Sequence, residues 1–257
     1  MDKSDLVIIK NGKEYLLQTG WSLSDSGSYE FRNKLQDRAF AHGSDMVGDG
    51  KIEGRIIQVE FDLQGATEQE HDAAVNGAYT YFGQTNYDLY VGRNDRLYHV
   101  AGLSKIKHKF QKGFKQRWSN VKVSLLLADP FRYAAEVTEM IAEYDSVQED
   151  AAINVNNPSS VDVPLIWTFI PPEGNSVPDI TVKHIESGQI FSLKDTLLTA
   201  PAVAVVNGEA GTVRRDTGNS INTFSGLFLH AHSGVNTFKY TGAACMIKIS
   251  FTARWFV

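Results

Sequence analysis

Cysteine is nearly missing from this sequence of 257 residues, in which Cys245 is the single example. A lone cysteine excludes an intramolecular disulfide framework and any metal site built from several thiolates. Cys245 lies in the apolar run Ala243–Met246, so we expect a buried and unreactive thiol, not a nucleophile.

Long apolar runs are also missing. No stretch approaches the roughly 20 consecutive apolar residues that a membrane-spanning helix needs. The first residues lack the basic and then apolar pattern of a secretory signal peptide. We therefore expect a soluble protein made in a reducing cytosol, with no membrane partner.

No broad excess of positive charge is present. Residues 1–133 contain 18 Lys and Arg against 17 Asp and Glu, and residues 134–257 contain 7 against 13. A nucleic-acid-binding domain usually carries a basic face, which neither half has, so we expect no sequence-specific nucleic-acid partner. The difference in charge between the halves is typical of two domains that face different neighbours.

The known signatures of catalytic sites are missing as well. There is no glycine-rich phosphate loop, nucleophile elbow or zinc-protease helix. His230 and His232 would share one face of a strand and could begin a metal site, but no third ligand can be named. Asp45, Asp49 and Glu53 do not match the calcium-loop spacing. A glycosidase-like pair cannot be selected among so many carboxylates. We therefore expect no enzyme, metal or cofactor.

What is present is a strand-rich first half with one helix. Asn11-Gly12 joins two short apolar runs as the preferred pair for a hairpin turn. A longer irregular segment then ends at residues 48–50, before an alternating strand at 57–63. Residues 67–82 are predicted as a helix, because Thr67 and Glu70 form a capping box and apolar residues recur at helical spacing.

The second half reads as strands and turns almost throughout. A short second helix is one interpretation of residues 134–144, but apolar and polar residues alternate clearly at 163–169 and 247–255. Many short strands separated by turns indicate a β-sandwich. We predict a mainly β protein with a domain at 1–133 and a second domain at 134–257.

A run of basic residues with no acidic residue lies before the domain boundary. Three of its lysines alternate with other residues, so on a strand they would form one positive stripe. The stripe is either a solvated face or a docking surface for an acidic neighbour, and nucleic acid is a third and weaker option. Trp21 and Trp118 lie in less regular segments and are both candidate interface residues. The basic residues are Lys105, Lys107, Lys109, Lys112, Lys115, Arg117 and Lys122.

A motif near the middle of the chain carries a family resemblance. The run Leu125–Tyr133 ends in Asp129, Pro130, Phe131, Arg132 and Tyr133, and it resembles the interdomain signature of siphophage distal tail proteins. A Ser-Gly-Val-Asn turn at 233–236 and a last strand with Arg-Trp at 254–255 fit the same family. The resemblance covers essentially the whole chain.

The resemblance implies an architecture and a role. The N-terminal domain would be a β-sandwich with one helix and a protruding hairpin, the belt, which grips the adjacent subunit of a hexameric ring. The belt would fall within residues 84–122 and carry the lysine stripe. The C-terminal domain would be a galectin-like sandwich. The implied partners are further copies of the chain, the tail tube protein, the tail-tip hub and receptor-binding or baseplate proteins, in a virion assembled in the host cytoplasm.

Three other functions compete with this one. A galectin-like sandwich is compatible with a carbohydrate-binding module or adhesin. Another ring-forming tail component, such as a tube or terminator subunit, is a second alternative. An enzyme is the third, although no catalytic constellation supports it.

Overall fold

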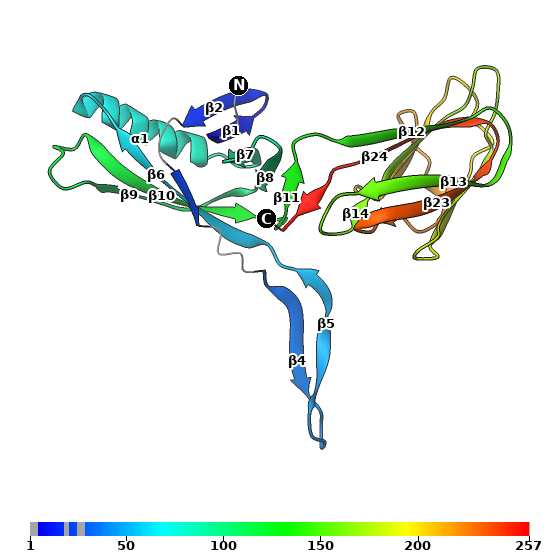
Figure 1. Ribbon diagram of the computed structural model, residues 1–257, viewed down its shortest axis with the longest axis horizontal. Coiled ribbons are helices and arrows are strands. Elements are labelled where there is room, and N and C mark those ends of the chain that lie inside the picture. The colour runs from blue at the N-terminus through cyan, green and yellow to red at the C-terminus, as the bar shows by residue number, and fades with distance from the viewer. Residues whose placement is uncertain (1–4, 18–20, 25–28, 257) are drawn as a thin grey trace. The chain divides into compact units, whose positions relative to one another are not determined.

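The computed structural model describes residues 5–17, 21–24 and 29–256. The chain divides into two compact units, one reaching to Ala135 and including Phe256, and the other spanning Glu136–Trp255. Both units are built from β-strands, and α1 (Glu68–Phe82) is the one α-helix among the described residues, as predicted (Figure 1). The domain boundary predicted between residues 133 and 134 remains a prediction.

The first unit contains two sheets, a helix and a separate hairpin. One sheet has the order β2-β1-β7-β8-β11 within this unit, and the other has the order β3-β6-β10-β9. The strands are β1 (Leu6–Lys10), β2 (Lys13–Leu17), β3 (Trp21–Ser24), β4 (Phe31–Asp37), β5 (Ser44–Ile52), β6 (Arg55–Gln64), β7 (Tyr87–Val91), β8 (Arg96–Val100), β9 (Gly102–Phe110), β10 (Trp118–Leu127) and β11 (Arg132–Ala134).

Local signals in the sequence explain two of these elements. Asn11 and Gly12 both have positive φ, which the predicted hairpin turn requires, and Lys10 pairs with Lys13 across it. Helix α1 spans Glu68–Phe82, and the predicted capping box between Thr67 and Glu70 is formed.

The core of the first unit lies between the two sheets and the helix. The alternating residues of β6 and β10 point inward and are almost completely buried, as Val59 and Val123 show. The helix adds Ala78 and Phe82, and the Phe82 ring stacks on Phe61 at 5.5 Å between centroids. This packing fixes the sheets from which the other surfaces of the unit are presented.

One prediction for the first unit is wrong. The segment before residue 48 is not irregular, because β4 and β5 pair with each other over most of its length (Figure 1). They form a two-stranded sheet that shares no ladder with another sheet of the described chain. Most of their side chains are exposed on both faces, so the sequence shows no alternation between buried and exposed positions.

The second unit packs two sheets with the orders β12-β24-β15-β18-β19-β20 and β13-β23-β16-β17-β21, and β14 pairs with β22. Its strands are β12 (Thr138–Tyr144), β13 (Gln148–Asn157), β14 (Val163–Pro164), β15 (Ile166–Ile170), β16 (Asp179–His184), β17 (Ile190–Lys194), β18 (Ala204–Asn207), β19 (Thr212–Arg215), β20 (Gly218–Asn219), β21 (Phe224–Gly226), β22 (His230–Ala231), β23 (Gly234–Gly242), β24 (Cys245–Phe251) and β25 (Arg254–Trp255), with a 3₁₀ turn η1 at Ile221–Thr223.

The core of the second unit is aromatic. Trp167 is fully buried, and its ring lies 5.2 Å from Phe238 and 6.0 Å from Phe191, so strands of both sheets meet there. The alternation predicted at 163–169 is therefore confirmed. The short helix proposed for 134–144 is wrong, because β12 pairs with β24 throughout and its half-buried residues recur at every second position.

Candidate assembly surfaces

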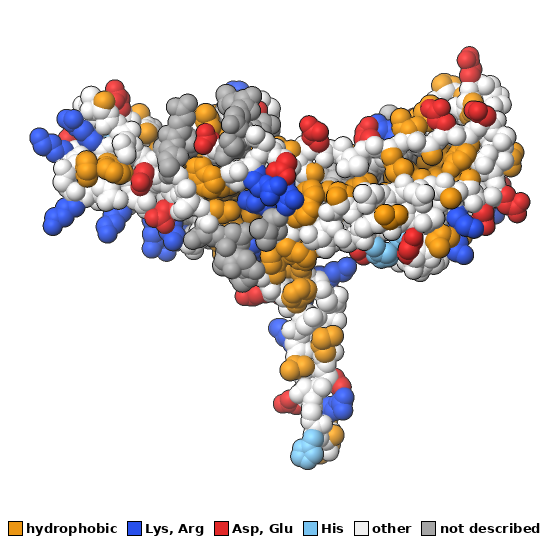
Figure 2. All heavy atoms as spheres, viewed as in Figure 1, with side chains coloured by type: hydrophobic (Ala, Val, Ile, Leu, Met, Phe, Trp, Pro, Cys, Tyr) orange, Lys and Arg blue, Asp and Glu red, His pale blue; other side chains and the backbone are white. Residues whose placement is uncertain are grey.

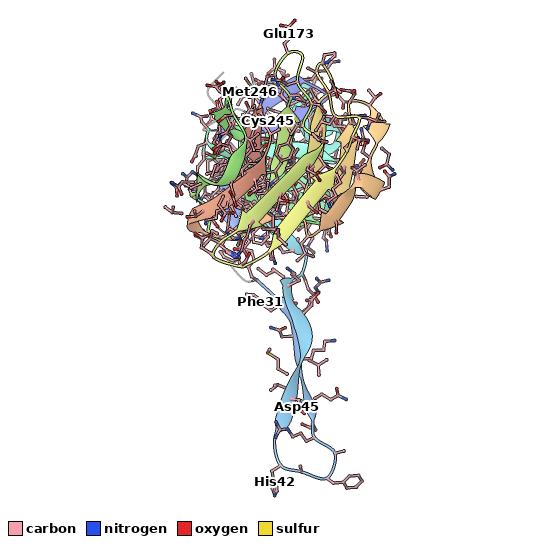
Figure 3. All side chains as sticks on the ribbon, turned by 90° about the vertical axis from the view of Figure 1, so that its right-hand side faces the viewer. Phe31, His42, Asp45, Glu173, Cys245 and Met246 are labelled. Carbon is pink, nitrogen blue, oxygen red and sulfur yellow. The ribbon has the colours of Figure 1, made fainter. Side chains whose placement is uncertain are left out.

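The hairpin β4–β5 projects from the first unit and carries apolar side chains that contact little of its own chain (Figure 3). Leu35 lies directly opposite Met46, and the two side chains are 77% and 70% exposed. Val47 and Phe31 are about half exposed. Figure 2 shows apolar side chains along most of the arm. An exposed apolar surface of this kind marks an interaction site more often than a free surface.

Polar contacts hold the hairpin in one register. Arg38 Nε and Nη2 donate to Asp45 Oδ1 at 2.9 and 2.7 Å, and Ser44 Oγ donates to Asp37 Oδ1 at 2.9 Å. The Gly50 amide donates to Asn33 Oδ1 at 3.1 Å. These bonds connect the two strands at both ends of the ladder, so contacts within the chain hold the arm in one register.

The base and the tip of the hairpin are also defined. At the base, the Glu53 amide donates to the Glu30 carbonyl at 2.9 Å, which brings the two ends of the arm together. At the tip, Phe40 is fully exposed and has φ of 59°, a backbone region that non-glycine residues rarely adopt. The tip therefore presents an aromatic ring directly to solvent.

The lysine stripe lies elsewhere. Lys105, Lys107 and Lys109 are exposed on β9, which is the edge strand of the sheet β3-β6-β10-β9, and Lys107 pairs with Lys122 of β10. The sequence placed the projecting hairpin within residues 84–122, and that position is corrected to 31–52. Lysines on an edge strand also discourage pairing with other strands. Their role in subunit contact remains a prediction.

The remaining basic residues of the run, Lys112, Lys115 and Arg117, lie in the turn between β9 and β10. Figure 2 shows Lys and Arg side chains gathered at that end of the first unit. The turn therefore extends the positively charged surface beyond strand β9.

The motif at 129–133 has a structural role in the first unit. Asp129 accepts hydrogen bonds from the Phe131 amide at 3.2 Å and from the Tyr133 hydroxyl. Arg55 Nε donates to the Pro130 carbonyl at 2.9 Å. The carboxylate thus closes the turn that β11 follows, and the arginine fixes the turn to the start of β6.

The candidate metal ligands are not brought together. His232 Nδ1 lies 2.8 Å from Asp162 Oδ2, whereas His230 Nδ1 is hydrogen-bonded to the Phe228 carbonyl at 3.1 Å. Asp45 pairs with Arg38, and Asp49 pairs with Arg32 at 2.7 Å. Within the described ranges, no group of three His, Cys, Asp or Glu residues is arranged to hold a metal ion.

A buried histidine of the second unit was not predicted from the sequence. His184 is completely buried, with Nδ1 2.8 Å from Ser187 Oγ and Nε2 3.1 Å from Asn236 Oδ1. Its Nε2 also lies 3.0 Å from Glu186 Oε2, and its ring centroid is 5.0 Å from that of His232. Burial lowers the pKa of His184.

Cys245 is buried as predicted, and burial raises the pKa of its thiol to about 11. At neutral pH the thiol is therefore protonated and unreactive.

Of the helices in the described ranges, none has both the length and the apolar character that a membrane crossing requires.

The candidate interface residues that sequence reasoning missed are the exposed apolar residues of the arm. The segment is mostly polar and shows no strand alternation, so the available signal was the presence of large apolar residues in it. These residues are Phe31, Leu35, Phe40, Met46 and Val47.

Comparison with solved structures identifies the fold. The Dit protein of phage SPP1, described as a paradigm of the hub adsorption apparatus in phages that infect Gram-positive hosts, matches with a TM-score of 0.73 and 12% identity. The match covers 97% of this chain and 98% of that one. A chain of the phage P2 baseplate in its activated conformation with calcium matches with a TM-score of 0.51 and 8% identity, over 96% and 97% of the two chains.

No family model and no curated protein matches the sequence. The structural matches nevertheless extend over nearly the whole chain. The resemblance predicted from the sequence is therefore confirmed at the level of the fold, which is the β-sandwich fold of the SPP1 Dit protein.

Proposed function

We propose that this chain, which has the fold of the SPP1 Dit protein, is a non-enzymatic structural component of a phage tail. In this proposal it forms a hexameric ring at the distal end of the tail, between the tail tube and the tip that contacts the host. The observation that carries the proposal is the arm β4–β5, which projects from the first unit and exposes large apolar side chains that have little of their own chain to bind.

Contact with a second copy of the chain would stabilise the arm. An isolated two-stranded hairpin is marginally stable in water, and its outer edges leave backbone groups unpaired. Packing the arm against a neighbour would bury Leu35 and Met46, and full burial of such a side chain contributes about 1.5–3 kcal/mol. A neighbouring copy of the chain would supply that surface.

Such a contact is heterologous, because the arm of one copy meets a different surface of the next. Repeated contacts of this type close into a ring when the rotation between copies permits it. The arm therefore takes the belt role that the sequence resemblance implied, in place of residues 84–122.

The remaining partners follow from the same proposal. The ring would contact the tail tube protein on one side and the tail-tip hub on the other, and the second unit would be available to receptor-binding or baseplate proteins. The protein would reside in the virion at the tail tip after assembly in the host cytoplasm. The role requires no cofactor.

Removal of the arm tests the proposal. A short glycine linker replaces residues 32–51, which is feasible because Phe31 and Ile52 are paired neighbours at the base. Native mass spectrometry and negative-stain images should show hexameric rings for the intact chain and monomers for the shortened one. Thermal unfolding should be nearly equal for both, because the core of the first unit excludes the arm.

Two results would contradict the proposal. One is an intact chain that stays monomeric at high concentration. The other is a shortened chain that still forms rings, which would mean that another surface holds the subunits together.

A further inference from the structure

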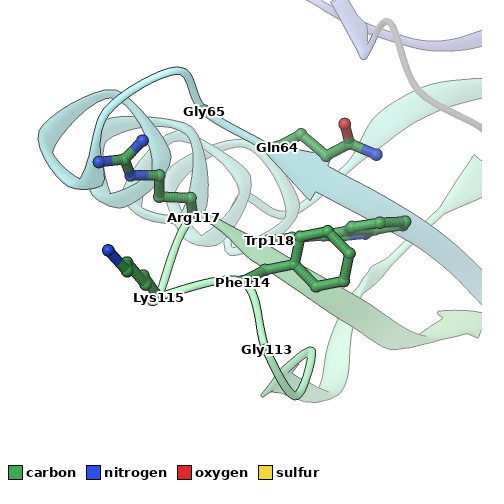
Figure 4. A pocket seen from close by; sticks show the side chains of 7 residues that line it. All are labelled: Gln64, Gly65, Gly113, Phe114, Lys115, Arg117 and Trp118. Atoms are coloured by element: carbon green, nitrogen blue, oxygen red, sulfur yellow. The ribbon is translucent and has the colours of Figure 1, made fainter.

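A cavity of about 350 Å³ lies beside the turn that joins β9 to β10. Phe114 and Trp118 form an aromatic wall, with ring centroids 4.6 Å apart in an edge-to-face arrangement. Lys115, Arg117 and Gln64 complete most of the lining. Figure 4 shows the two cationic side chains to one side of the turn and the two aromatic rings to the other.

The backbone of the turn is fixed by hydrogen bonds. The Arg117 amide donates to the Phe114 carbonyl at 2.9 Å, and the Gly65 amide donates to the Arg117 carbonyl at 2.9 Å. Lys115 and Gln116 both have positive φ, of 45° and 58°, so the chain reverses sharply between the aromatic residues. The cationic groups are consequently presented by a constrained loop at the rim of the cavity.

The polar groups of the cavity are mainly hydrogen-bond donors. Lys115 and Arg117 have no carboxylate partner among the described residues, and residues 103–128 contain no Asp or Glu. The Trp118 indole Nε1 is buried and has no hydrogen-bond partner in the described part of the chain. A buried donor without an acceptor is costly, but this atom is closed off from solvent, so an incoming acceptor would meet Lys115 and Arg117 instead.

This chemistry favours a carboxylate ligand with an apolar neighbour. Carboxylates form strong charge-assisted hydrogen bonds with arginine and lysine. Phe114 is 49% exposed and offers an apolar contact beside them. A neutral sugar fits less well, because its hydroxyl groups need acceptors as well as donors and Gln64 supplies the single side-chain oxygen of the lining.

The second unit carries a segment with the complementary pattern. In the corner between β12 and β13, Val147 is 78% exposed and lies between the exposed carboxylates of Asp145 and Glu149. Residues 136–150 contain six acidic residues and no Lys or Arg. An apolar side chain next to negative charges complements an aromatic wall that has two positive charges on one side of it.

We propose that the cavity beside Trp118 binds the acidic corner Asp145–Glu149 of a second copy of this chain. Val147 contacts Phe114 and Trp118, and the flanking carboxylates accept hydrogen bonds from Lys115 and Arg117. The contact is separate from the arm β4–β5, so it goes beyond the assembly proposed above and does not depend on it.

A peptide titration tests the cavity directly. The full chain is titrated with a labelled peptide of residues 141–150 and with a matched peptide in which Asp145→Asn and Glu149→Gln remove the two charges. The double variant Lys115→Gln/Arg117→Gln should bind the acidic peptide at least about tenfold more weakly, because both charge-assisted hydrogen bonds to the peptide are lost. Trp118→Phe should also weaken binding.

The matched control is Lys105→Gln/Lys109→Gln, which removes the same charge from β9 outside the cavity. This control should bind like the unchanged chain, and the neutral peptide should not bind. Failure of the unchanged chain to bind the acidic peptide would overturn the proposal. Equal losses in the control variant, or equal binding of the neutral peptide, would also overturn it, because both indicate unspecific charge attraction.

The identity of the occupant needs a second measurement. Carbodiimide links lysine to carboxylate without a spacer, so chains labelled with ¹⁵N and unlabelled chains are mixed and then cross-linked. Links from Lys115 to Asp145 or Glu149 between labelled and unlabelled chains support a second copy as the occupant. Peptide binding without such links would overturn that assignment. Both readouts can succeed or fail whether or not the arm forms a ring.

Discussion

Leu35 and Met46 face each other across the β4–β5 ladder, and both remain at least 70% exposed. A directly opposed pair in a sheet usually gains stability by packing its side chains against a further layer. Here the described chain supplies no such layer over the pair. The side chains of these two residues therefore become buried only when another surface covers them.

The first prediction concerns this pair. The double variant Leu35→Ser/Met46→Ser should lose ring formation, because full burial of each side chain contributes about 1.5–3 kcal/mol to the contact. The melting temperature should hardly change, since both residues are already exposed. Native mass spectrometry measures the assembly, and Gln36→Ser, on the other face of the arm, is the control that should still form rings.

The second prediction concerns the backbone of the arm. A Cβ at Gly48 would lie 2.1 Å from the Arg32 carbonyl oxygen and 2.8 Å from the Asn33 Cα, so Gly48→Val should disrupt the pairing of β4 with β5. Hydrogen exchange should become faster in residues 44–52, and rings should be lost. Gly50→Asn is the control, because that site has open space and asparagine tolerates its positive φ.

The third prediction concerns pH. Burial lowers the pKa of His184, so the unfolded chain binds the extra proton more readily than the folded chain. The contribution of His184 to the free energy of unfolding is fully present above the pKa of histidine in the unfolded chain, about 6.5. It declines as the pH drops from there toward the lower pKa of the folded chain. Asn236, Glu186 and Asp162 act to raise this pKa and His232 acts to lower it, but burial is the largest influence and the net shift is downward.

Melting temperatures between about pH 5 and pH 8 measure this effect. We expect His184→Gln to flatten the decline on the acidic side, whereas His42→Gln, at the exposed tip of the arm, should leave the profile unchanged. An equal acidic decline in His184→Gln would show that another group is responsible.

The fourth prediction concerns the motif at the end of the first unit. Asp129→Ala removes the acceptor for the Phe131 amide and the Tyr133 hydroxyl, so it should lower the free energy of unfolding by about 1–3 kcal/mol. Asp129→Asn keeps a side-chain oxygen and should cost less. Denaturant unfolding measures the difference, and equal losses in both variants would mean that charge and not geometry matters.

The fifth prediction concerns the lysine stripe. If β9 contacts an acidic neighbour, Lys107→Glu/Lys109→Glu should weaken ring formation in light scattering. An unchanged hexamer would assign these lysines to protection of an edge strand, and would leave the fold untouched.

The sequence predicted those elements whose signals are local or face a core in the same chain. The turn at Asn11-Gly12, the capping box of Thr67 and Glu70, and the alternation at 57–63 all depend on neighbours within a few residues or on one buried face. The turn and the capping box were found because their cause lies within the same short segment, and the strand was found because one of its faces is buried in the core of its own chain.

The failures have a different physical origin. The arm β4–β5 has no buried face in its own chain, so its apolar residues show no period of two. Strand β12 lies at a sheet edge, and its inward residues Met140, Ala142 and Tyr144 are only half-buried. Its alternation is therefore weak, and the same sequence was also compatible with a short helix. The burial of His184 also depends on Asn236 and His232, which are distant in sequence, and no single-sequence pattern reports such contacts.

The single buried thiol has a practical consequence for spectroscopy. Cys245 is inaccessible and its pKa is about 11, so maleimide and spin-label reagents should spare it near neutral pH. A cysteine placed at the exposed tip by Phe40→Cys would then be the one reactive position in an otherwise native chain. Distances between labelled tips, measured by electron paramagnetic resonance, would report the diameter and symmetry of any assembly in solution.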